Sequence, residues 1–109
     1  MAEYVKDVWS TEAREIMPGF RGHFVHSEHT THVYWDADEG ASVPDHSHPH
    51  EQMGLMLEGE ADFTIGDQQM RVTAGGMWRI PGGVVHKVVA LERPVRAIDI
   101  FHPPREEYQ

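Results

Sequence analysis

The sequence of 109 residues contains no cysteine, which excludes disulfide frameworks, thiolate metal sites and cysteine nucleophiles. Positive charge is also scarce: nine Lys and Arg stand against 18 Asp and Glu, giving a net charge of −9 with neutral histidines. A duplex-binding protein needs a basic surface to neutralise phosphates, and this chain has no basic run. We therefore expect no nucleic-acid partner.

Long apolar segments are missing as well. No run approaches the ~18 residues that a membrane-spanning helix requires, and residues 1–12 lack the basic start and apolar stretch of a signal peptide. We therefore expect no membrane partner and a cytoplasmic location. The length suits one hydrophobic core and is short for two, so we expect a single domain over residues 1–109.

Histidine, by contrast, is abundant. Nine histidines in so short a chain point towards metal binding or acid–base chemistry. Ten glycines and seven prolines require the chain to turn often.

Strand-forming residues dominate from Phe20 onward, in short runs separated by turn residues. This alternation is typical of an all-β sandwich or barrel. Weak helical periodicity occurs once, over Ser10–Met17, and Pro18-Gly19 would end that helix. We expect about eight strands, within His23–Val25, Thr31–Trp35, His46–Leu57 (a strand pair), Ala61–Ile65, Met70–Thr73, Met77–Ile80, Val84–Leu91 and Val95–Phe101.

Three histidines alternate along one of these segments, at His46, His48 and His50, and Gln52 follows. Residues two apart in a strand share a face, so imidazoles and an amide oxygen on that face can converge on a cation. Glu51 would be a stronger anionic ligand, but its parity sends it to the opposite face. A further ligand must come from elsewhere in the chain.

The candidate for this ligand is His86, because it follows the tight turn Pro81-Gly82-Gly83, which could aim it back towards the earlier strand. Both groups of residues fall into spaced motifs. The first motif is Gly40, His46-Ser47-His48, Gln52 and Gly59, and the second is Gly75, Pro81, Gly83 and His86. Both resemble the motifs of the cupin superfamily, with Gln52 in place of the usual Glu and Ala90 where Asn is often found. The resemblance implies a small single-domain jelly-roll barrel, the double-stranded β-helix. It also implies one divalent transition metal ion held by His46, His48, Gln52 and His86.

A glutamine ligand is neutral and would leave the charge of the ion uncompensated, making it a stronger Lewis acid than a glutamate version. Redox chemistry is then less favoured, so we expect polarisation of an anionic or carbonyl-bearing substrate. The identity of the ion stays open among Ni, Zn, Fe and Mn. The alternative is a metal-free barrel in which the four residues are ordinary polar side chains.

The expected last strand carries Asp99 on an otherwise apolar face, with Ala97 and Phe101. If this face lines the barrel, the carboxyl group has a raised pKa and suits acid–base work. The alternative is that Ile98 and Ile100 face the interior and that Asp99 is solvated.

Arg105 follows the stiff pair Pro103-Pro104. That pair could hold the guanidinium at the barrel mouth, where it would clamp a carboxylate. Otherwise Arg105 is an ordinary surface residue.

A closer resemblance lies in the stretch His46–Met53 and in the ending Asp99-x-Phe101-x-x-x-Arg105. Both are similar to the small pectin-degradation cupins that linearise unsaturated uronates. The resemblance implies that Asp99, Phe101 and Arg105 line a catalytic site. The implied substrate is a 4,5-unsaturated monouronate from pectin or alginate lysis, and the implied product is the linear 4-deoxy-5-keto uronate. A preference for galacturonate- or mannuronate-derived substrate stays open, as does the group that protonates C4.

Two other functions stay open: another small metal-dependent cupin enzyme, such as an oxygenase or a lyase, and a non-catalytic sugar-binding cupin. We also expect a homodimer, because a domain this small benefits from covering its sheet edges. Tyr4 and Trp9 are candidates for that contact, and Trp35 and Trp78 are expected to serve packing.

Four further histidines recur at every third residue, at His23, His26, His29 and His32. A step of three residues changes face in a strand, so we do not expect these four to share an ion.

Overall fold

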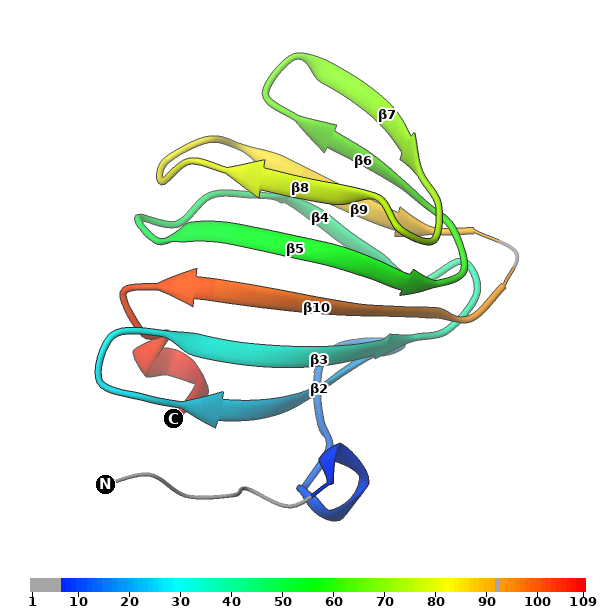
Figure 1. Cartoon of the computed structure of the whole chain (residues 1–109). Coiled ribbons are helices and arrows are strands. Elements are labelled where there is room, and N and C mark those ends of the chain that lie inside the picture. The colour runs from blue at the N-terminus through cyan, green and yellow to red at the C-terminus, as the bar shows by residue number, and fades with distance from the viewer. Residues whose placement is uncertain (1–6, 92) are drawn as a thin grey trace.

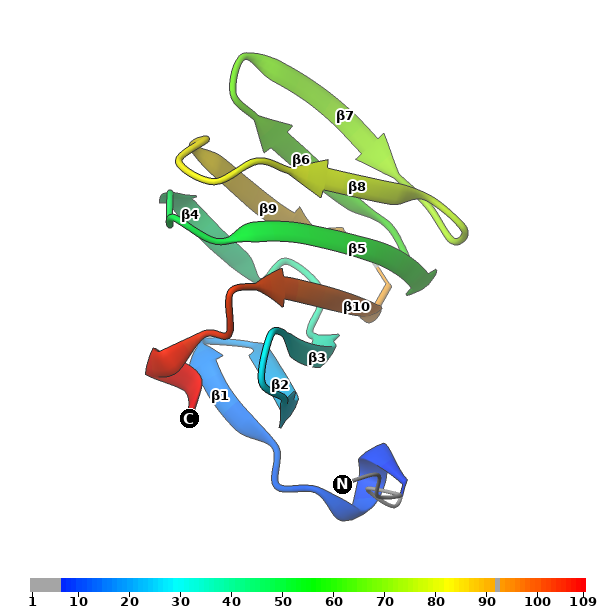
Figure 2. The ribbon, with the colours of Figure 1, turned by 60° about the vertical axis from the view of Figure 1, so that its left-hand side comes forward.

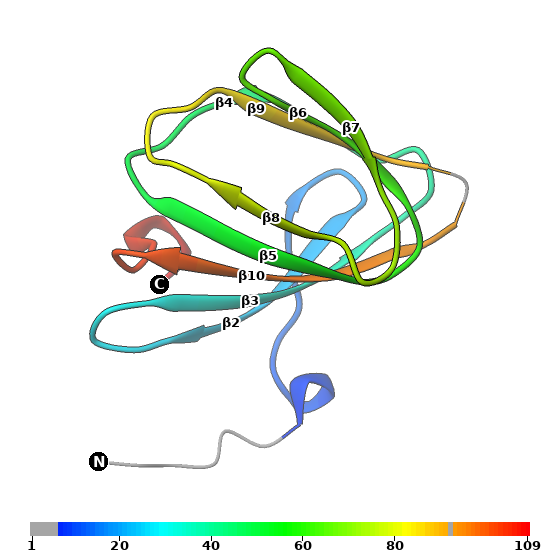
Figure 3. The same ribbon diagram turned by 45° about the horizontal axis from the view of Figure 1, so that its top comes forward.

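Two β-sheets face each other in the computed structural model, which describes residues 7–91 and 93–109 (Figure 1). The all-β prediction is confirmed. The larger sheet has the strand order β1-β2-β3-β10-β5-β8, and the smaller has the order β4-β9-β6-β7. The view in Figure 3 shows the smaller sheet closing over the larger one.

All recorded strand pairs are antiparallel. The strands of the larger sheet are β1 Arg14–Met17, β2 Phe20–His26, β3 Thr31–Ala37, β10 Val95–His102, β5 Glu51–Glu58 and β8 Met77–Ile80. Those of the smaller sheet are β4 Ser42–His46, β9 His86–Ala90, β6 Ala61–Ile65 and β7 Gln68–Val72. Short 3₁₀ helices, η1 Val8–Ser10 and η2 Glu106–Tyr108, flank the strands. In these ranges there is no helix with the length and apolar content to cross a bilayer.

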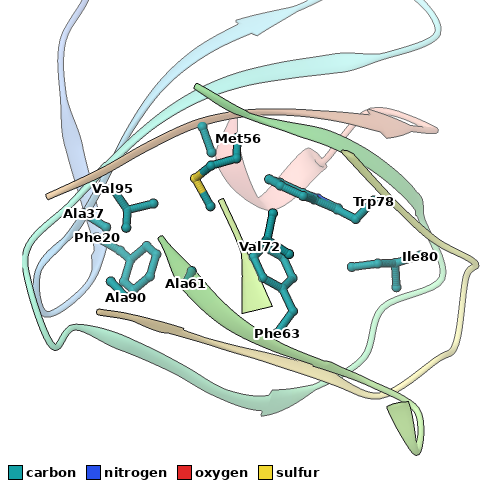
Figure 4. Packing of buried hydrophobic residues seen from close by; sticks show 11 residues of the cluster. Phe20, Ala37, Met56, Ala61, Phe63, Val72, Trp78, Ile80, Ala90 and Val95 are labelled. Carbon is teal, nitrogen blue, oxygen red and sulfur yellow. The ribbon is translucent and has the colours of Figure 1, made fainter. Parts of the chain in front are cut away.

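Apolar side chains fill the space between the sheets (Figure 4). Met56 and Trp78 of the larger sheet meet Phe63 and Val72 of the smaller one, and the Phe63 and Trp78 ring centroids are 4.6 Å apart. Burying a large apolar side chain stabilises a fold by roughly 1.5–3 kcal/mol, so this cluster is a main source of stability.

The helix predicted over Ser10–Met17 is wrong. In this part of the chain only η1 is helical, and Arg14–Met17 forms edge strand β1 beside β2 (Figure 2). Cross-strand pairing decides this, because Glu15 lies opposite Arg21 and Met17 lies opposite Phe20. Tertiary contacts thus outweigh a weak local helical preference.

The strand pair predicted over His46–Leu57 is also divided differently. β4 ends at His46 in the smaller sheet, and β5 begins at Glu51 in the larger one. The four residues between them, which include Pro49, cross from one sheet to the other. The alternation argument for a shared strand face is therefore wrong for this segment.

Loops and strand ends from distant parts of the sequence meet at one end of the barrel, the left end in Figure 1. The β4–β5 loop, the β8–β9 loop and the end of β10 lie there, together with the C-terminal segment. The candidate site is built at this end.

Candidate functional site

Three histidines from separate elements come together at this end of the barrel. His46 ends β4, His48 lies in the β4–β5 loop, and His86 begins β9 opposite His46. One ring nitrogen of each lies within 4.8 Å of those of the other two. Nitrogens that share one ion at about 2.0–2.1 Å are at most about 4 Å apart, so the three rings need only a small movement to close on a metal.

Each of the three rings is oriented by a backbone carbonyl that accepts a hydrogen bond from its Nδ1–H. This bond fixes the tautomer and leaves the lone pair of Nε2 for a metal. The Nε2 atom of His86 is buried and has no hydrogen-bond partner among the described residues. The N···O distances are 2.9 Å for His46 to Pro44, 3.1 Å for His48 to His50 and 2.8 Å for His86 to Val84.

Burial keeps two of these imidazoles neutral. Burial, with Arg105 and His86 nearby, lowers the pKa of His48 to about 4. Burial likewise lowers the pKa of His86. A neutral imidazole is the form that binds metal, so these environments favour ligation at neutral pH.

Gln52 joins the histidine cluster to the barrel interior. It is buried on β5, its Oε1 lies 3.1 Å from His48 Nε2, and it also hydrogen bonds to Asp99. The carboxylate of Asp99 can only accept, so the Gln52 amide N–H donates to it and Oε1 is left facing the histidines. A glutamate here could not donate to Asp99 and would place a second negative charge beside it.

The donor set therefore fits a divalent metal ion: three oriented imidazoles, one with an orphaned buried nitrogen, and an adjacent amide oxygen. His50 shares the parity of His46 and His48 but is absent from the cluster of converging nitrogens. Its ring centroid lies 5.6 Å from that of His48, and its Nδ1 is buried with no partner in the described residues.

Asp99 lies on the buried face of β10, as one of the two alternatives for this strand predicts. Val95, Ala97, Asp99 and Phe101 are buried in alternation with more exposed neighbours. Burial raises the pKa of Asp99 to about 6, although hydrogen bonds from Trp78, Gln52 and Trp35 favour its charged form. Such a carboxyl group can take up or release a proton near neutral pH.

Two indole N–H groups hold the carboxylate of Asp99. Trp78 Nε1 donates to Oδ1 at 2.8 Å, and Trp35 Nε1 donates to Oδ2 at 2.9 Å. The expectation that both tryptophans serve packing missed this role, and only their pairing with a buried aspartate in three dimensions reveals it. The two donors fix the plane of the carboxyl group.

Glycines make room for both indoles. Gly54 lies opposite Trp78 on one side and Asp99 on the other, so Trp78 reaches Asp99 across a residue without a side chain. A Cβ added at Gly22 would lie 2.9 Å from the Trp35 ring, so Gly22 leaves space for that indole on the side of β3 away from Asp99.

Arg105 is buried at the open end of the barrel. Its guanidinium lies 4.7 Å from the ring centroid of Phe101 and 4.5 Å from that of Tyr108. Nε pairs with Glu107, and Nη2 donates to the Tyr108 hydroxyl at 3.3 Å. Two aromatic faces and one carboxylate therefore fix the orientation of this cation.

A cavity of about 90 Å³ connects these groups. Since one water needs about 10–15 Å³ by this measure, the cavity can admit a small organic molecule. Phe101 and Met56 supply apolar surface in the cavity. Its polar lining comes from His46, His86, Gln52, Asp99 and Arg105, among others.

The four histidines at every third residue, from His23 to His32, form no metal-binding cluster among the described residues. His29 is largely exposed, His32 is exposed on β3, and His23 Nδ1 hydrogen bonds to Thr11 at 2.8 Å. His26 contacts Thr31 and the Tyr108 carbonyl. The suggested dimer contact Tyr4 lies outside the described residues.

A family model described as a cupin domain matches residues 33–101. The chain belongs to the cupin family. This confirms the fold implied by the motif residues, and within the matched range lie His46, His48, Gln52, His86, Asp99 and Phe101. Arg105 lies beyond it.

Solved cupin structures are similar over most of the chain. An RmlC-like cupin from Shewanella frigidimarina matches with a TM-score of 0.91 at 27% identity, over 99% of this chain and 97% of that one. KdgF from Halomonas sp. matches with a TM-score of 0.87 at 25% identity, over 93% and 94%. A variant of oxalate decarboxylase from Bacillus subtilis matches with a TM-score of 0.80 at 25% identity, over 88% of this chain but 28% of that one.

Among curated sequences, an uncharacterised protein from Streptomyces coelicolor is 27% identical over 67 residues. The match covers 62% of this chain and 64% of the relative. The cupin neighbours include an enzyme, oxalate decarboxylase. A function for this chain can be proposed from two of its own features, the cupin fold and a three-histidine cluster suited to a metal.

Proposed function

We propose that this protein is a metal-dependent enzyme that converts 4,5-unsaturated monouronates into linear 4-deoxy-5-keto uronates. The observation that carries the proposal is the position of Asp99: a buried carboxyl group with a pKa of about 6, joined through Gln52 to a three-histidine cluster. Structural similarity to KdgF from Halomonas sp. over 93% of this chain supports it, together with the resemblance of the motif residues to the uronate-linearising cupins.

Charge favours an anionic substrate at this site, although the protein as a whole is acidic. With a net charge of −9, the protein as a whole repels a uronate. Arg105 is the cation at the cavity, and a divalent ion on His46, His48, Gln52 and His86 would add positive charge. That ion would act as a Lewis acid towards the oxygen atoms of the substrate.

In the proposed mechanism, Arg105 binds the substrate carboxylate through the N–H groups that Glu107 and Tyr108 leave unused. Phe101 packs against the sugar ring. Asp99 holds and moves protons, because its pKa lies near neutrality while Trp35 and Trp78 keep its carboxyl group in one plane.

The reaction balances as an isomerisation. A proton adds to C4 and the oxygen of a water molecule adds to C5, which gives a hemiketal. The bond between C5 and the ring oxygen then breaks, C5 becomes a ketone, and C1 is left as an aldehyde hydrate. Loss of water from C1 returns the molecule that was taken up.

The test is an assay on unsaturated monouronate freshly released by a lyase. The absorbance of its enol ether should fall faster with protein than without, since the uncatalysed opening supplies the background rate. The acceleration should disappear with chelator and in His48→Ala. No acceleration with either galacturonate- or mannuronate-derived substrate would reject the proposal.

A non-catalytic sugar-binding cupin is the second candidate, favoured by the aromatic and cationic lining of the cavity. It would bind uronates without turnover, and Asp99→Asn would then leave binding intact with no rate to lose. An oxygenase would consume O₂ in the same samples, which the proposed isomerisation does not.

We also propose that two copies pair through the outer face of the larger sheet. Five of the six large apolar side chains exposed among the described residues lie on it. The pairing of the strands joins these side chains into one surface. Ile100 on β10 lies between Met53 on β5 and His32 on β3, and His32 lies opposite Val25 on β2. A patch of this kind marks an interaction surface, and a second copy with the same patch is self-complementary. The five residues are Val25, Met53, Leu57, Met77 and Ile100.

A further inference from the structure

The C-terminal segment follows β10 directly at the open end of the barrel (Figure 2). There Tyr108 lines the same cavity as Asp99, Phe101 and Arg105. Tyr108 lies seven residues beyond the matched cupin domain, and no sequence motif points to it.

Aromatic contacts fix the ring of Tyr108. Its centroid lies 4.8 Å from that of Phe24, 6.4 Å from that of Phe101 and 6.5 Å from that of Trp35. The guanidinium of Arg105 covers the ring at 4.5 Å. The phenol therefore has a defined position in the cavity wall.

The hydroxyl of Tyr108 is left as a donor. Its oxygen accepts a hydrogen bond from Arg105 Nη2 at 3.3 Å, so its own hydrogen is directed to another acceptor. Burial raises the pKa of Tyr108, which keeps the phenol protonated at neutral pH. A protonated phenol beside a guanidinium presents two donors to one oxygen-rich anion.

A one-way chain of hydrogen bonds ties this segment to the barrel. The Arg105 backbone N–H donates to Thr31 Oγ1 at 2.8 Å, and the Thr31 hydroxyl donates to His26 Nδ1 at 2.9 Å. His26 Nε2–H then donates to the Tyr108 carbonyl at 3.2 Å. Thr31 has no exposed surface, so its hydroxyl has no access to competing water.

We infer that Tyr108 is a substrate-binding residue, whose hydroxyl donates to an oxygen of the bound uronate beside the carboxylate held by Arg105. Thr31 and His26 are positioning residues that act through the backbone of Tyr108. The inference rests on the proposed function and adds to it a specificity group supplied by the C-terminal segment.

The experiment compares wild type, Tyr108→Phe and Tyr34→Phe in the unsaturated-uronate assay with metal-loaded protein. Tyr34 is a matched control, because it lies on β3 with its side chain on the opposite face from Asp99. Loss of a hydrogen bond to an anion should raise the KM of Tyr108→Phe about tenfold. Its kcat should change less than about twofold, because the lost hydrogen bond holds the substrate and the transition state equally well. Tyr34→Phe should match wild type.

Two further measurements separate binding from packing. Calorimetric titration with galacturonate, which lacks the double bond, should show the same loss of affinity in Tyr108→Phe. His26→Gln should raise KM in the wild-type background but add nothing in the Tyr108→Phe background, because it acts through Tyr108.

The outcomes are distinguishable. An active wild type with an unchanged KM and galacturonate affinity in Tyr108→Phe would overturn the role of Tyr108 alone. A wild type without turnover would overturn the proposed function and this inference together.

Discussion

The indole ring of Trp78 lies across the backbone of Gly54, its partner on the neighbouring strand. A Cβ added at Gly54 would lie 2.2 Å from Cε2 of that ring, far inside contact distance. On the other side of Gly54 lies Asp99, which accepts the Trp78 N–H at 2.8 Å. The glycine thus permits the hydrogen bond that holds the buried carboxyl group.

Gly54→Ala should therefore destabilise the protein. Overpacking of this kind costs about 1–3 kcal/mol, because Trp78 must leave its rotamer or β5 must shift. Denaturant unfolding measures the loss. Trp78→Phe removes the crowding atoms, so the cost of Gly54→Ala should be smaller in that background. Equal costs in both backgrounds would show that the contact with Trp78 is not the cause.

The buried carboxyl group should make stability depend on pH. The folded-state pKa of Asp99, about 6, lies above its ordinary value of 3.8. The folded protein holds a proton that the unfolded chain releases between these values. The stabilisation is therefore fully present below pH ~4 and is lost as the pH rises through about 6. A shift of this size corresponds to about 3 kcal/mol.

His48 acts in the opposite direction over the same range. Its folded-state pKa of about 4 lies below the ordinary 6.5, so its contribution is present above pH 6.5 and is lost as the pH falls towards 4. The contribution of Asp99 to stability is therefore measured as the difference between wild type and a variant that lacks this carboxyl group. In metal-free protein, the free energy of unfolding of wild type minus that of Asp99→Asn should decrease from pH 4 to pH 7. A difference that stays flat would contradict the assigned pKa.

Metal addition should stabilise the protein through the histidine cluster. A ligand that binds only the folded state at 100 times its Kd adds about 2.7 kcal/mol, so the melting temperature should rise on titration with Ni²⁺ or Zn²⁺. His48→Ala should lose most of this rise. His29→Ala is the matched control, because the His29 side chain is 76% exposed and lies outside the cluster. An equal rise in both variants would place the ion elsewhere.

Substitutions of Arg105 and Asp99 should affect substrate binding and the chemical step separately. Arg105→Ala should mainly raise KM, by about 10- to 100-fold for a lost charged hydrogen bond, because Arg105 holds the carboxylate throughout the reaction. Asp99→Asn should mainly lower kcat, because it removes the proton carrier while leaving a side chain of the same shape. Steady-state rates on unsaturated monouronate measure both. Full turnover by Asp99→Asn would show that another group handles the protons.

The sequence predicts the all-β fold and singles out the three histidines that cluster in the structure, because strand alternation and motif spacing are local properties. It predicts correctly that Asp99 shares a face with Ala97 and Phe101. It fails where contacts between distant strands decide: His46 and His48 converge because the chain crosses between sheets, not because they share a strand face. The hydrogen bonds from Trp35 and Trp78 to Asp99, and the packing of Tyr108 against Phe24 in the cavity wall, depend on the same long-range contacts.

The outer face of the larger sheet supplies a test of the proposed homodimer. Met53 is half exposed near the middle of this apolar face, opposite Ile100. Met53→Glu would place two buried charges near the symmetry axis of a dimer, and an unpaired buried charge is strongly unfavourable. We expect the wild type to have the mass of a dimer by light scattering and Met53→Glu that of a monomer. Val85→Glu is the matched control, because Val85 is 48% exposed but lies outside β1, β2, β3, β5, β8 and β10. A monomeric wild type, or a Met53→Glu variant that stays dimeric, would rule out pairing through this face.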